Sequence, residues 1–445
     1  MTDFTTEYRE YCEKHGVPER VELLLCDLNA VLRGKWLPGD QVGKLVAGDV
    51  RLPISTYAPN IMGSEPPETG LGITVGDPDG VLAPVLGTLR PVPWCKRSVA
   101  QVLVEMKVAG RISALSTRAI LQNLLDRFKA LGLRPVVATE LEFYIVKTRA
   151  NATDAPEPPD RLPDAQNYDL EALSRYQAIL TDIQDASVAQ GLATDTLTAE
   201  FGPGQFEINF HHSDDVRGAA DTALLFRRLV RAVVASHGYE ATFMAKPYAH
   251  KPGNGMHVHV SVLDAKGQNI FAAATGVAPK LGAAVAGVLS TMRELQAIFA
   301  PHLNSYRRFQ VNSFAPSRAN WGLDNRAAAV RLPDTKGKAA RLEHRISGAD
   351  VNPYLALTAI LGGMLHGLET NPPLPPPLED SSADASARLT HDWITAVDLF
   401  EKSAFAEKLF GKAYRDIYVA VRRDEIAVLS AEISTVEYRY YLSRL

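Results

Sequence analysis

The chain has 445 residues, which is too long for one small core and indicates two or three domains. Its hydrophobic content of 46% and charged content of 22% are ordinary for a globular protein, and its net charge of -4 excludes a basic field for nucleic acid or anionic lipid. The three cysteines show no CxxC spacing, which excludes a disulfide framework and a thiolate metal site. Because the first residues are charged and carry no apolar signal segment, we expect a cytoplasmic protein without a membrane span.

Residues 1–104 are predicted to form a small β-rich domain, and residues 105–445 a larger second domain. The first domain should begin with a helix at 5–17, which ends where Gly16 and Pro18 interrupt the helical pattern. Strands are expected at 21–28 and 31–36, and Asp27 and Asn29 are typical turn formers between them.

Helices and strands are mixed in the second domain. A helix at 117–131 should precede a β-branched and aromatic strand at 138–146. Because the strands suggest antiparallel neighbours rather than regular βαβ units, the predicted fold class is α+β. Further helices are expected at 170–190, 217–236, 270–292 and 353–368, and further strands at 198–211 and 256–263.

The strand at 138–146 carries two acidic residues with a spacing of two. Residues two apart on a strand point to the same face, so Glu140 and Glu142 should lie side by side, where they repel each other unless a cation is near. Three later segments carry polar side chains in a similar strand pattern: two of them repeat the spacing of two, and the third has two carboxylates on either side of a Gly/Pro turn. They contribute Glu200 and Glu207; His257, His259 and Ser261; and Arg341, Glu343 and Arg345.

Carboxylates and imidazoles that converge in this way predict a metal centre. Oxygen-dominated ligation with one imidazole suits Mg²⁺ or Mn²⁺ better than Zn²⁺. Two such ions with several arginines are typical of enzymes that transfer a phosphoryl group from ATP. Guanidinium groups bind carboxylate or phosphate through paired hydrogen bonds, and the candidates are Arg308, Arg326, Arg331 and Arg345.

Six motifs in this order and approximate spacing resemble the glutamine synthetase superfamily. They are ELEF at 140–143, EFGPGQFE at 200–207, NGMHVH at 254–259, NSYRRF at 304–309, NRAAAVR at 325–331 and RLEHR at 341–345. The resemblance covers nearly the whole chain. It implies a small N-terminal β-grasp domain and a catalytic domain with a curved antiparallel sheet. It also implies a homo-oligomer of stacked hexameric rings, in which one subunit's N-terminal domain completes its neighbour's active site.

The same resemblance implies roles for individual residues. Glu142, Glu200 and Glu207 would hold one metal ion, and Glu140, His257 and Glu343 would hold another. ATP would be bound by His259, Ser261, Lys338 and Arg341. The transferred phosphate would contact Arg326 and Arg331. L-Glutamate would be bound by Arg308, Arg345 and Gly253. The implied reaction begins with phosphorylation of the γ-carboxylate of glutamate by ATP, and an amine then displaces the phosphate.

Two positions indicate which amine is used. Family members that use ammonium carry an Asp in the N-terminal domain and a Glu in a later flap, and counting from the motifs places Val31 and Phe314 there. Loss of both acids favours an amine larger than ammonia, either a polyamine or an alkyl or aryl monoamine. The segments around these positions resemble the γ-glutamyl-polyamine synthetase branch. Pro252, where ammonium enzymes usually have Asn, puts the glutamate contact beside Gly253 in doubt.

Two other functions stay open from the sequence. One is an ordinary ammonium-dependent glutamine synthetase with a rearranged ammonium site. The other is a non-catalytic structural member of the superfamily, which we would expect to have lost metal ligands, whereas all six candidates are present here.

Overall fold

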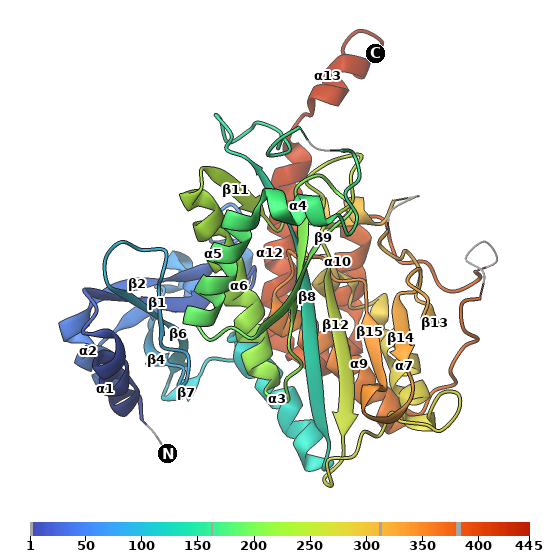
Figure 1. Ribbon diagram of the computed structural model, residues 1–445, viewed down its shortest axis with the longest axis horizontal. Coiled ribbons are helices and arrows are strands. Elements are labelled where there is room, and N and C mark those ends of the chain that lie inside the picture. The colour runs from blue at the N-terminus through green and yellow to red at the C-terminus, as the bar shows by residue number, and fades with distance from the viewer. Residues whose placement is uncertain (1–2, 162, 311–313, 380–383) are drawn as a thin grey trace.

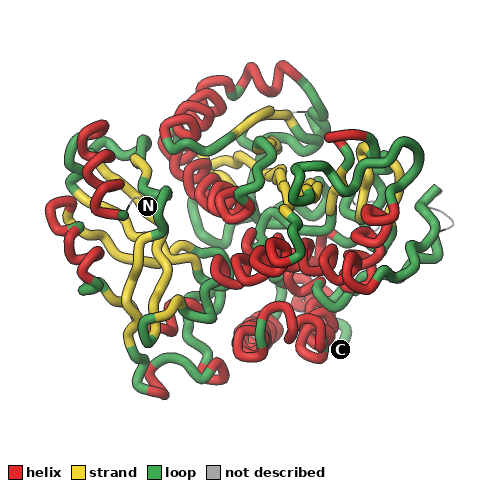
Figure 2. The backbone as a smooth tube through the Cα atoms, turned by 90° about the horizontal axis from the view of Figure 1, so that it is seen from below, coloured by secondary structure: helices red, strands yellow, loops and turns green. Residues whose placement is uncertain are grey.

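Two β-sheets organise the protein, and each lies in a separate part of the chain. The computed structural model describes residues 3–161, 163–310, 314–379 and 384–445. Figure 1 shows the small sheet with α1 and α2 on the left and the larger sheet in the centre, and Figure 2 shows the small sheet as a lobe beside the main body. The predicted mixture of helices and strands is confirmed.

The small sheet has the order β2-β1-β6-β4-β3, and β5 and β7 pair with β6. Its β1 and β6 strands are parallel, whereas its other pairs are antiparallel. The turn after β1 forms as expected, because the Oδ1 of Asp27 accepts hydrogen bonds from the backbone N–H groups of Asn29 and Val31. The strands are β1 (Arg20–Cys26), β2 (Leu32–Pro38), β3 (Arg51–Pro53), β4 (Asp79–Pro84), β5 (Arg90–Pro91), β6 (Val99–Val108) and β7 (Arg111–Ile112).

The division into domains at residues 104 and 105 stays a prediction, and the structure shows what lies there. Strand β6 runs through both residues and pairs with β1 and β4 along its length. Residues up to Ile112 therefore belong to the small sheet.

The larger sheet holds the predicted acidic strand near its middle. Its order is β13-β14-β15-β12-β8-β10-β9, and β11 also pairs with β8. The sheet was expected to be antiparallel, but β13 and β14 are parallel, so it is mixed. Its strands are β8 (Arg134–Lys147), β9 (Thr194–Ala199), β10 (Gln205–Phe210), β11 (Tyr239–Thr242), β12 (Met256–Leu263), β13 (Trp321–Leu323), β14 (Val330–Asp334) and β15 (Arg341–His344).

Helices pack around the larger sheet, and their buried faces form most of the core. The expected helix at 270–292 is wrong in its first part, because α7 begins only at Pro279, a residue that favours the first turn of a helix. Among the described residues, no helix is both long and apolar enough to cross a lipid bilayer. The helices are α1 (Phe4–His15), α2 (Gly43–Ala47), α3 (Thr117–Ala130), α4 (Leu170–Arg175), α5 (Gln177–Ala189), α6 (Val216–Ser236), α7 (Pro279–Met292), α8 (Gln296–Phe299), α9 (Pro353–Thr370), α10 (Trp393–Lys402), α11 (Ala404–Phe410), α12 (Lys412–Ala431) and α13 (Thr435–Tyr441).

Candidate active site

A cavity of about 500 Å³ lies against the larger sheet and collects most of the predicted site residues. Strands β8, β10, β12, β14 and β15 each contribute side chains to it. The predicted residues that line it are Glu140, Glu142, Glu200, Glu207, Gly253, His257, Arg308, Phe314, Arg326, Arg331, Glu343 and Arg345.

Strand register brings these side chains together. Glu142 lies directly opposite Glu207 on β10, and Glu140 lies opposite His257 on β12. Glu343 on β15 is in turn opposite Arg331 on β14. Directly opposed residues on neighbouring strands place their Cβ atoms close together on one face, so one polar face runs across five strands.

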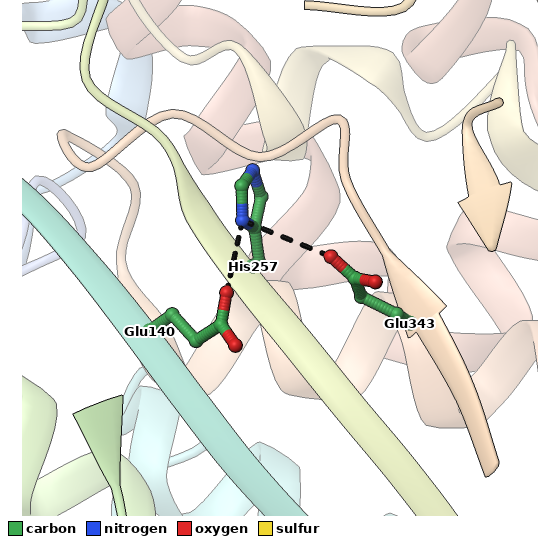
Figure 3. Close-up of side chains that lie close together, drawn as sticks. All are labelled: Glu140, His257 and Glu343. Atoms are coloured by element: carbon green, nitrogen blue, oxygen red, sulfur yellow. Dashed lines mark hydrogen bonds and ion pairs between the residues drawn. The ribbon is translucent and has the colours of Figure 1, made fainter. Parts of the chain in front are cut away.

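The first group of side chains that could hold a metal ion consists of Glu140, His257 and Glu343, the three residues that the sequence was expected to bring together. One ligand atom from each lies within 4.8 Å of the others. Figure 3 shows Nδ1 of His257 between the two carboxylates, 3.1 Å from Oε2 of Glu140 and 3.9 Å from Oε1 of Glu343. Burial opposes ionisation of Glu140, but hydrogen bonds from His257 and His259 outweigh it and hold its pKa below the ordinary value.

The second group differs in part from the prediction. Glu142 and Glu207 are brought together, but the third donor within 4.8 Å is His257 rather than Glu200. Glu200 follows β9 and lines the same cavity. The backbone N–H of Glu200 donates to the carbonyl oxygen of Gln205 on β10 at 2.9 Å, and its expected role as a metal ligand with Glu142 and Glu207 stays a prediction.

The carboxylates of the second group carry an unfavourable concentration of negative charge. Burial, followed by repulsion from Glu140, Glu142 and Glu200, raises the pKa of Glu207 to about 10. Burial and repulsion from Glu142 raise the pKa of Glu200 to about 7. A divalent cation would relieve this repulsion, so the donor set fits Mg²⁺ or Mn²⁺.

Arginines line the same cavity as the carboxylates. Arg331 Nη1 donates to Glu343 Oε2 at 3.0 Å, and Arg345 forms an ion pair with the other oxygen of the same carboxylate. Arg308 is buried and donates from Nη1 to the carbonyl oxygen of Ile346 at 2.8 Å. Guanidinium groups at a carboxylate-lined cavity can bind anionic substrates in paired hydrogen bonds.

The four residues expected at ATP lie beside the cavity rather than in its wall. His259 Nε2 is 2.8 Å from Oε1 of Glu140, and Arg341 Nε donates to His259 Nδ1 at 3.2 Å. Ser261 lies two residues after His259 on β12. Lys338 lies in a short exposed helical turn before β15. These residues lie on β12, at the start of β15 and in the turn before β15, and their role in binding ATP stays a prediction.

Aromatic side chains line another part of the cavity. The rings of Phe201 and Phe314 meet edge to face with centroids 5.2 Å apart, and Tyr168 lines the same cavity. Tyr168 has a positive φ of 58°, a conformation that no sequence pattern indicated. Val31 does not line this cavity within the chain; it lines a second cavity beside α6.

One residue of the site was missed although its motif gave a signal. Gln205 is fully buried and donates from Nε2 to the carbonyl oxygen of Gly253 at 3.0 Å and to Oδ1 of Asn254 at 3.1 Å. It lies two residues before Glu207 on the same strand, so the period of two could have placed it on the polar face.

Comparison with known proteins agrees with this geometry. The family model for the glutamine synthetase catalytic domain matches residues 114–441. The chain belongs to the glutamine synthetase family. Members of this family are carbon–nitrogen ligases, and this chain is a ligase of the family.

Several curated members of the glutamine synthetase family are similar over most of the chain. γ-Glutamylputrescine synthetase PuuA of Escherichia coli (strain K12) is 36% identical, covering 99% of this chain and 95% of that protein. Glutamate–isopropylamine ligase of a Pseudomonas species is 30% identical over 98% of this chain and 97% of that protein. Glutamine synthetase of Pyrococcus abyssi is 29% identical over 92% of this chain and 90% of that protein.

Solved structures from the family share the fold as well. A GmaS/ADP complex superposes with a TM-score of 0.86 at 26% identity and covers 100% of both chains. GmaS without ligand gives a TM-score of 0.87, also at 26% identity, over 99% of this chain and 100% of that chain. The expected glutamine-synthetase-type fold is thus confirmed.

Proposed function

We propose that the protein is an ATP-dependent ligase that joins the γ-carboxylate of L-glutamate to an amine larger than ammonia. The observation that carries this proposal is the cavity in which two groups of metal-ligating side chains share His257 and are flanked by arginines. All six predicted metal ligands line that cavity, which disfavours a non-catalytic member of the family.

The chemistry requires activation of a carboxylate. Its oxygen is too poor a leaving group for direct attack by an amine, so phosphorylation of the γ-carboxylate comes first. Arg326 and Arg331 line the cavity where the transferred phosphate would carry its charge, and Arg308 and Arg345 supply guanidinium groups for the carboxylates of glutamate. Divalent metal ions, when bound, neutralise charge that develops on the phosphate oxygens. ATP as the phosphate donor is supported by the similar GmaS structure, which is a complex with ADP.

The choice of amine is supported by the aromatic part of the cavity. Phe314 occupies the position at which we expect ammonium-using relatives to carry Glu, and its ring packs on Phe201. Aromatic surface binds hydrocarbon better than it binds a small hydrated cation. Three relatives are a γ-glutamylputrescine synthetase, a glutamate–isopropylamine ligase and a γ-glutamylethanolamide synthetase. Each of these names contains an organic amine or its amide, which supports an organic amine as the substrate here.

One other activity has specific support. Glutamine synthetases from several archaea also match this chain, among them that of Pyrococcus abyssi. An ammonium-dependent glutamine synthetase is therefore the second candidate.

An amine panel tests the proposal directly. Phosphate release is measured with ATP, Mg²⁺ and L-glutamate plus ammonium, methylamine, isopropylamine, benzylamine, ethanolamine or putrescine. We expect kcat/KM for at least one organic amine to exceed that for ammonium by about tenfold or more, the discrimination that one apolar contact can provide. Mass spectrometry of the γ-glutamylamide excludes simple ATP hydrolysis. Activity with ammonium alone would replace the proposal with glutamine synthetase.

A further inference from the structure

A buried amide lies where three segments of the catalytic cavity meet. Gln205, on β10, is 1% exposed and lines the cavity. Its Oε1 accepts a hydrogen bond from the backbone N–H of Gly202 at 3.0 Å, and its Nε2 donates to the carbonyl oxygen of Gly253 and to Oδ1 of Asn254. A primary amide has one oxygen acceptor and two N–H donors, so these bonds engage the whole group in one orientation.

The loop at 252–255, which Gln205 contacts, is held at two consecutive carbonyl oxygens. Tyr144 on β8 lies directly opposite Gln205 in the strand register. Its hydroxyl donates to the carbonyl oxygen of Pro252 at 3.0 Å, next to the Gly253 carbonyl to which Gln205 donates. Because two neighbouring strands carry these donors, the loop takes its position from the larger sheet.

The loop is also fixed on its other side. Asn254 is fully buried, its Nδ2 donates to the carbonyl oxygen of Met244 at 2.9 Å, and its backbone N–H donates to that of Ala245 at 2.8 Å. A buried oxygen that loses its hydrogen-bond donor cannot turn to solvent without displacing the chain around it. The bonds from Gln205 to Gly253 and Asn254 are therefore costly to remove.

The position of this loop determines the position of Arg308. A Cβ atom on Gly253 would lie 2.4 Å from the carbonyl oxygen of Ala245 and 2.8 Å from Cγ of Arg308, so the glycine packs directly on the arginine side chain. Arg308 is 4% exposed, and its Nη1 is held by the carbonyl oxygen of Ile346 at 2.8 Å. In an interior packed this closely, a shift of the loop moves the side chain that lies against it.

The backbone of Gln205 connects the same loop to the carboxylates. Its carbonyl oxygen accepts hydrogen bonds from the backbone N–H of Glu200 at 2.9 Å and from Nε2 of Gln166 at 3.1 Å. At the end of the loop, the backbone N–H of Gly255 donates to Oε2 of Glu142 at 2.6 Å. Gln205 thus joins the turn that carries Glu200 to the loop that lies against Arg308.

We propose that Gln205 is a positioning residue, which holds the loop at Gly253, and through it the guanidinium group of Arg308, in the place that L-glutamate requires. The assignment rests on the proposed function, in which Arg308 binds a carboxylate of glutamate. Without the Nε2 donor two buried oxygen atoms lose a partner, so the loop shifts to hydrate them. Because paired hydrogen bonds to a carboxylate depend on the orientation of the guanidinium group, this shift weakens glutamate binding.

Gln205→Met tests the assignment, since Met has a similar length and volume but no N–H donor. Gln190→Met is the matched control: Gln190 is fully buried, donates from Nε2 to the carbonyl oxygen of Pro91 at 2.8 Å, and does not line the catalytic cavity. We expect Gln205→Met to raise KM for glutamate by about tenfold or more, while kcat and KM for ATP change by less than about threefold. Gln190→Met should keep all three at their wild-type values.

Hydrogen exchange measures the loop without any turnover. In Gln205→Met the backbone N–H groups at 250–256 should exchange faster than in the wild type, because the loop opens more often once it is released from β10. In Gln190→Met the exchange of the same residues should be unchanged. This readout separates an effect on the loop from a general loss of stability, which thermal unfolding of both variants records.

Tyr144→Phe provides a second, independent change at the same loop. It removes the hydrogen bond to Pro252 and leaves β10 intact, whereas Tyr418→Phe removes an equally buried hydroxyl that donates to the carbonyl oxygen of Ala297 at 2.7 Å, and is its control. Tyr144→Phe should raise KM for glutamate and Tyr418→Phe should not. Because Tyr144 and Gln205 act on one loop, the double variant should raise KM by less than the product of the two single effects.

A wild-type KM for glutamate in folded Gln205→Met would overturn the assignment, as would an equal rise in Gln190→Met or unchanged exchange at 250–256. If circular dichroism shows Gln205→Met to be unfolded, Tyr144→Phe with its control decides, and a wild-type KM in Tyr144→Phe then overturns the assignment. The proposed function fails separately: it is lost, and the assignment with it, if the wild-type protein forms no γ-glutamyl product with ammonium or with any amine.

Discussion

At the scale of single residues, Glu343 connects most of the catalytic constellation. It is 1% exposed, it lies in the first metal group, and both its oxygens are held by arginines. Burial opposes its ionisation, but His257, Arg345 and His259 outweigh burial and lower its pKa. Glu343 is therefore an anion in the metal-free protein, ready to bind a cation. Glu200 and Glu207 are in the opposite situation, because burial and repulsion raise the pKa of each.

Replacement of Glu343 by Ala should abolish catalysis while the fold persists. The change removes one donor of the first metal group and leaves Arg345 without its ion-pair partner. We expect kcat to fall by more than about 100-fold, since even residues that only support metal ligands change activity by roughly 10–100-fold. Glu10→Ala, at an exposed position of α1, is the control. Full activity of Glu343→Ala with a normal circular dichroism spectrum would remove Glu343 from the metal site.

The metal-free protein should lose stability as the pH rises. The pKa of Glu200 is raised to about 7 and that of Glu207 to about 10, so both carboxyls are protonated more readily in the folded than in the unfolded chain. Their contribution to stability is complete below the ordinary Glu pKa and is lost as the pH rises through 7 toward 10. In EDTA, Tm should therefore fall by a few degrees between pH 5 and pH 9.

Mg²⁺ should reverse this trend, because it binds the ionised carboxylates and displaces their protons. Calorimetry in buffers of different ionisation enthalpy should detect proton release at pH 7.5. Glu207→Gln should reduce both the proton release and the pH dependence of Tm in EDTA. Identical melting curves for wild type and Glu207→Gln across this pH range would contradict the assigned ionisation.

Phe314 is expected to control the choice of amine. A carboxylate at this position would attract ammonium and would disrupt the apolar contact with Phe201. Phe314→Glu should therefore raise the ratio of ammonium to alkylamine kcat/KM by about tenfold, whereas Phe314→Leu should leave it nearly unchanged. An unaltered ratio in Phe314→Glu would show that this side chain does not contact the amine.

At the scale of elements, helix pairs behind the larger sheet depend on glycines where their backbones come close. Helices α7 and α9 pack against each other along their length. A Cβ atom on Gly367 would lie 2.0 Å from the carbonyl oxygen of Ala283, which cannot move away without displacing α7. At Gly282 the nearest atom is 3.3 Å away and belongs to the flexible side chain of Leu374. The two glycines therefore differ in what they contribute.

Gly367→Ala and Gly282→Ala form a matched pair for this packing. We expect Gly367→Ala to lower the free energy of unfolding by about 1–3 kcal/mol, the usual effect of overpacking. Gly282→Ala should be close to neutral, because the gain in helix propensity offsets a small shift of Leu374. Urea unfolding followed by circular dichroism measures both. Equal destabilisation by the two changes would argue against close packing at Gly367.

At the scale of the whole molecule, the C-terminal helix α13 is exposed along its full length in the described part of the chain. Figure 1 shows it projecting from the body of the protein. None of its residues is buried, and several apolar side chains that follow or belong to it are more than half exposed, including Val436, Tyr441 and Leu442. Exposed apolar clusters of this kind mark contact surfaces. We therefore propose that α13 contacts another copy of the chain, in agreement with the stacked rings expected from the sequence.

Removal of residues 432–445 tests this contact. Light scattering coupled to size-exclusion chromatography should show a lower particle mass for the shortened chain than for the full chain. The circular dichroism spectrum should change little, because α12 ends at Ala431 and keeps its own packing. Val436→Asp with Leu442→Asp should reduce the mass in the full-length chain as well. An unchanged mass in both variants would exclude α13 from the assembly.

Local periodicity in the sequence was sufficient to predict the strands and the shared polar face. Glu140, Glu142, His257 and Glu343 could be assigned to one face because the period of two is a property of any strand. The start of α7 was missed, since the apolar run from residue 270 satisfies the helical pattern equally well before and after Pro279. Gln205 was missed although the period of two places it on the same face as Glu207, because an uncharged amide does not by itself indicate a metal or phosphate site.

The sequence by itself determined the family, the two sheets and the residue types that make up the catalytic cavity. Only the tertiary structure decided that His257 stands between both carboxylate groups and that Val31 lines a cavity beside α6 rather than the catalytic cavity. The reason is that periodicity fixes the face on which a side chain lies, whereas the distance between side chains on different strands depends on register and sheet curvature.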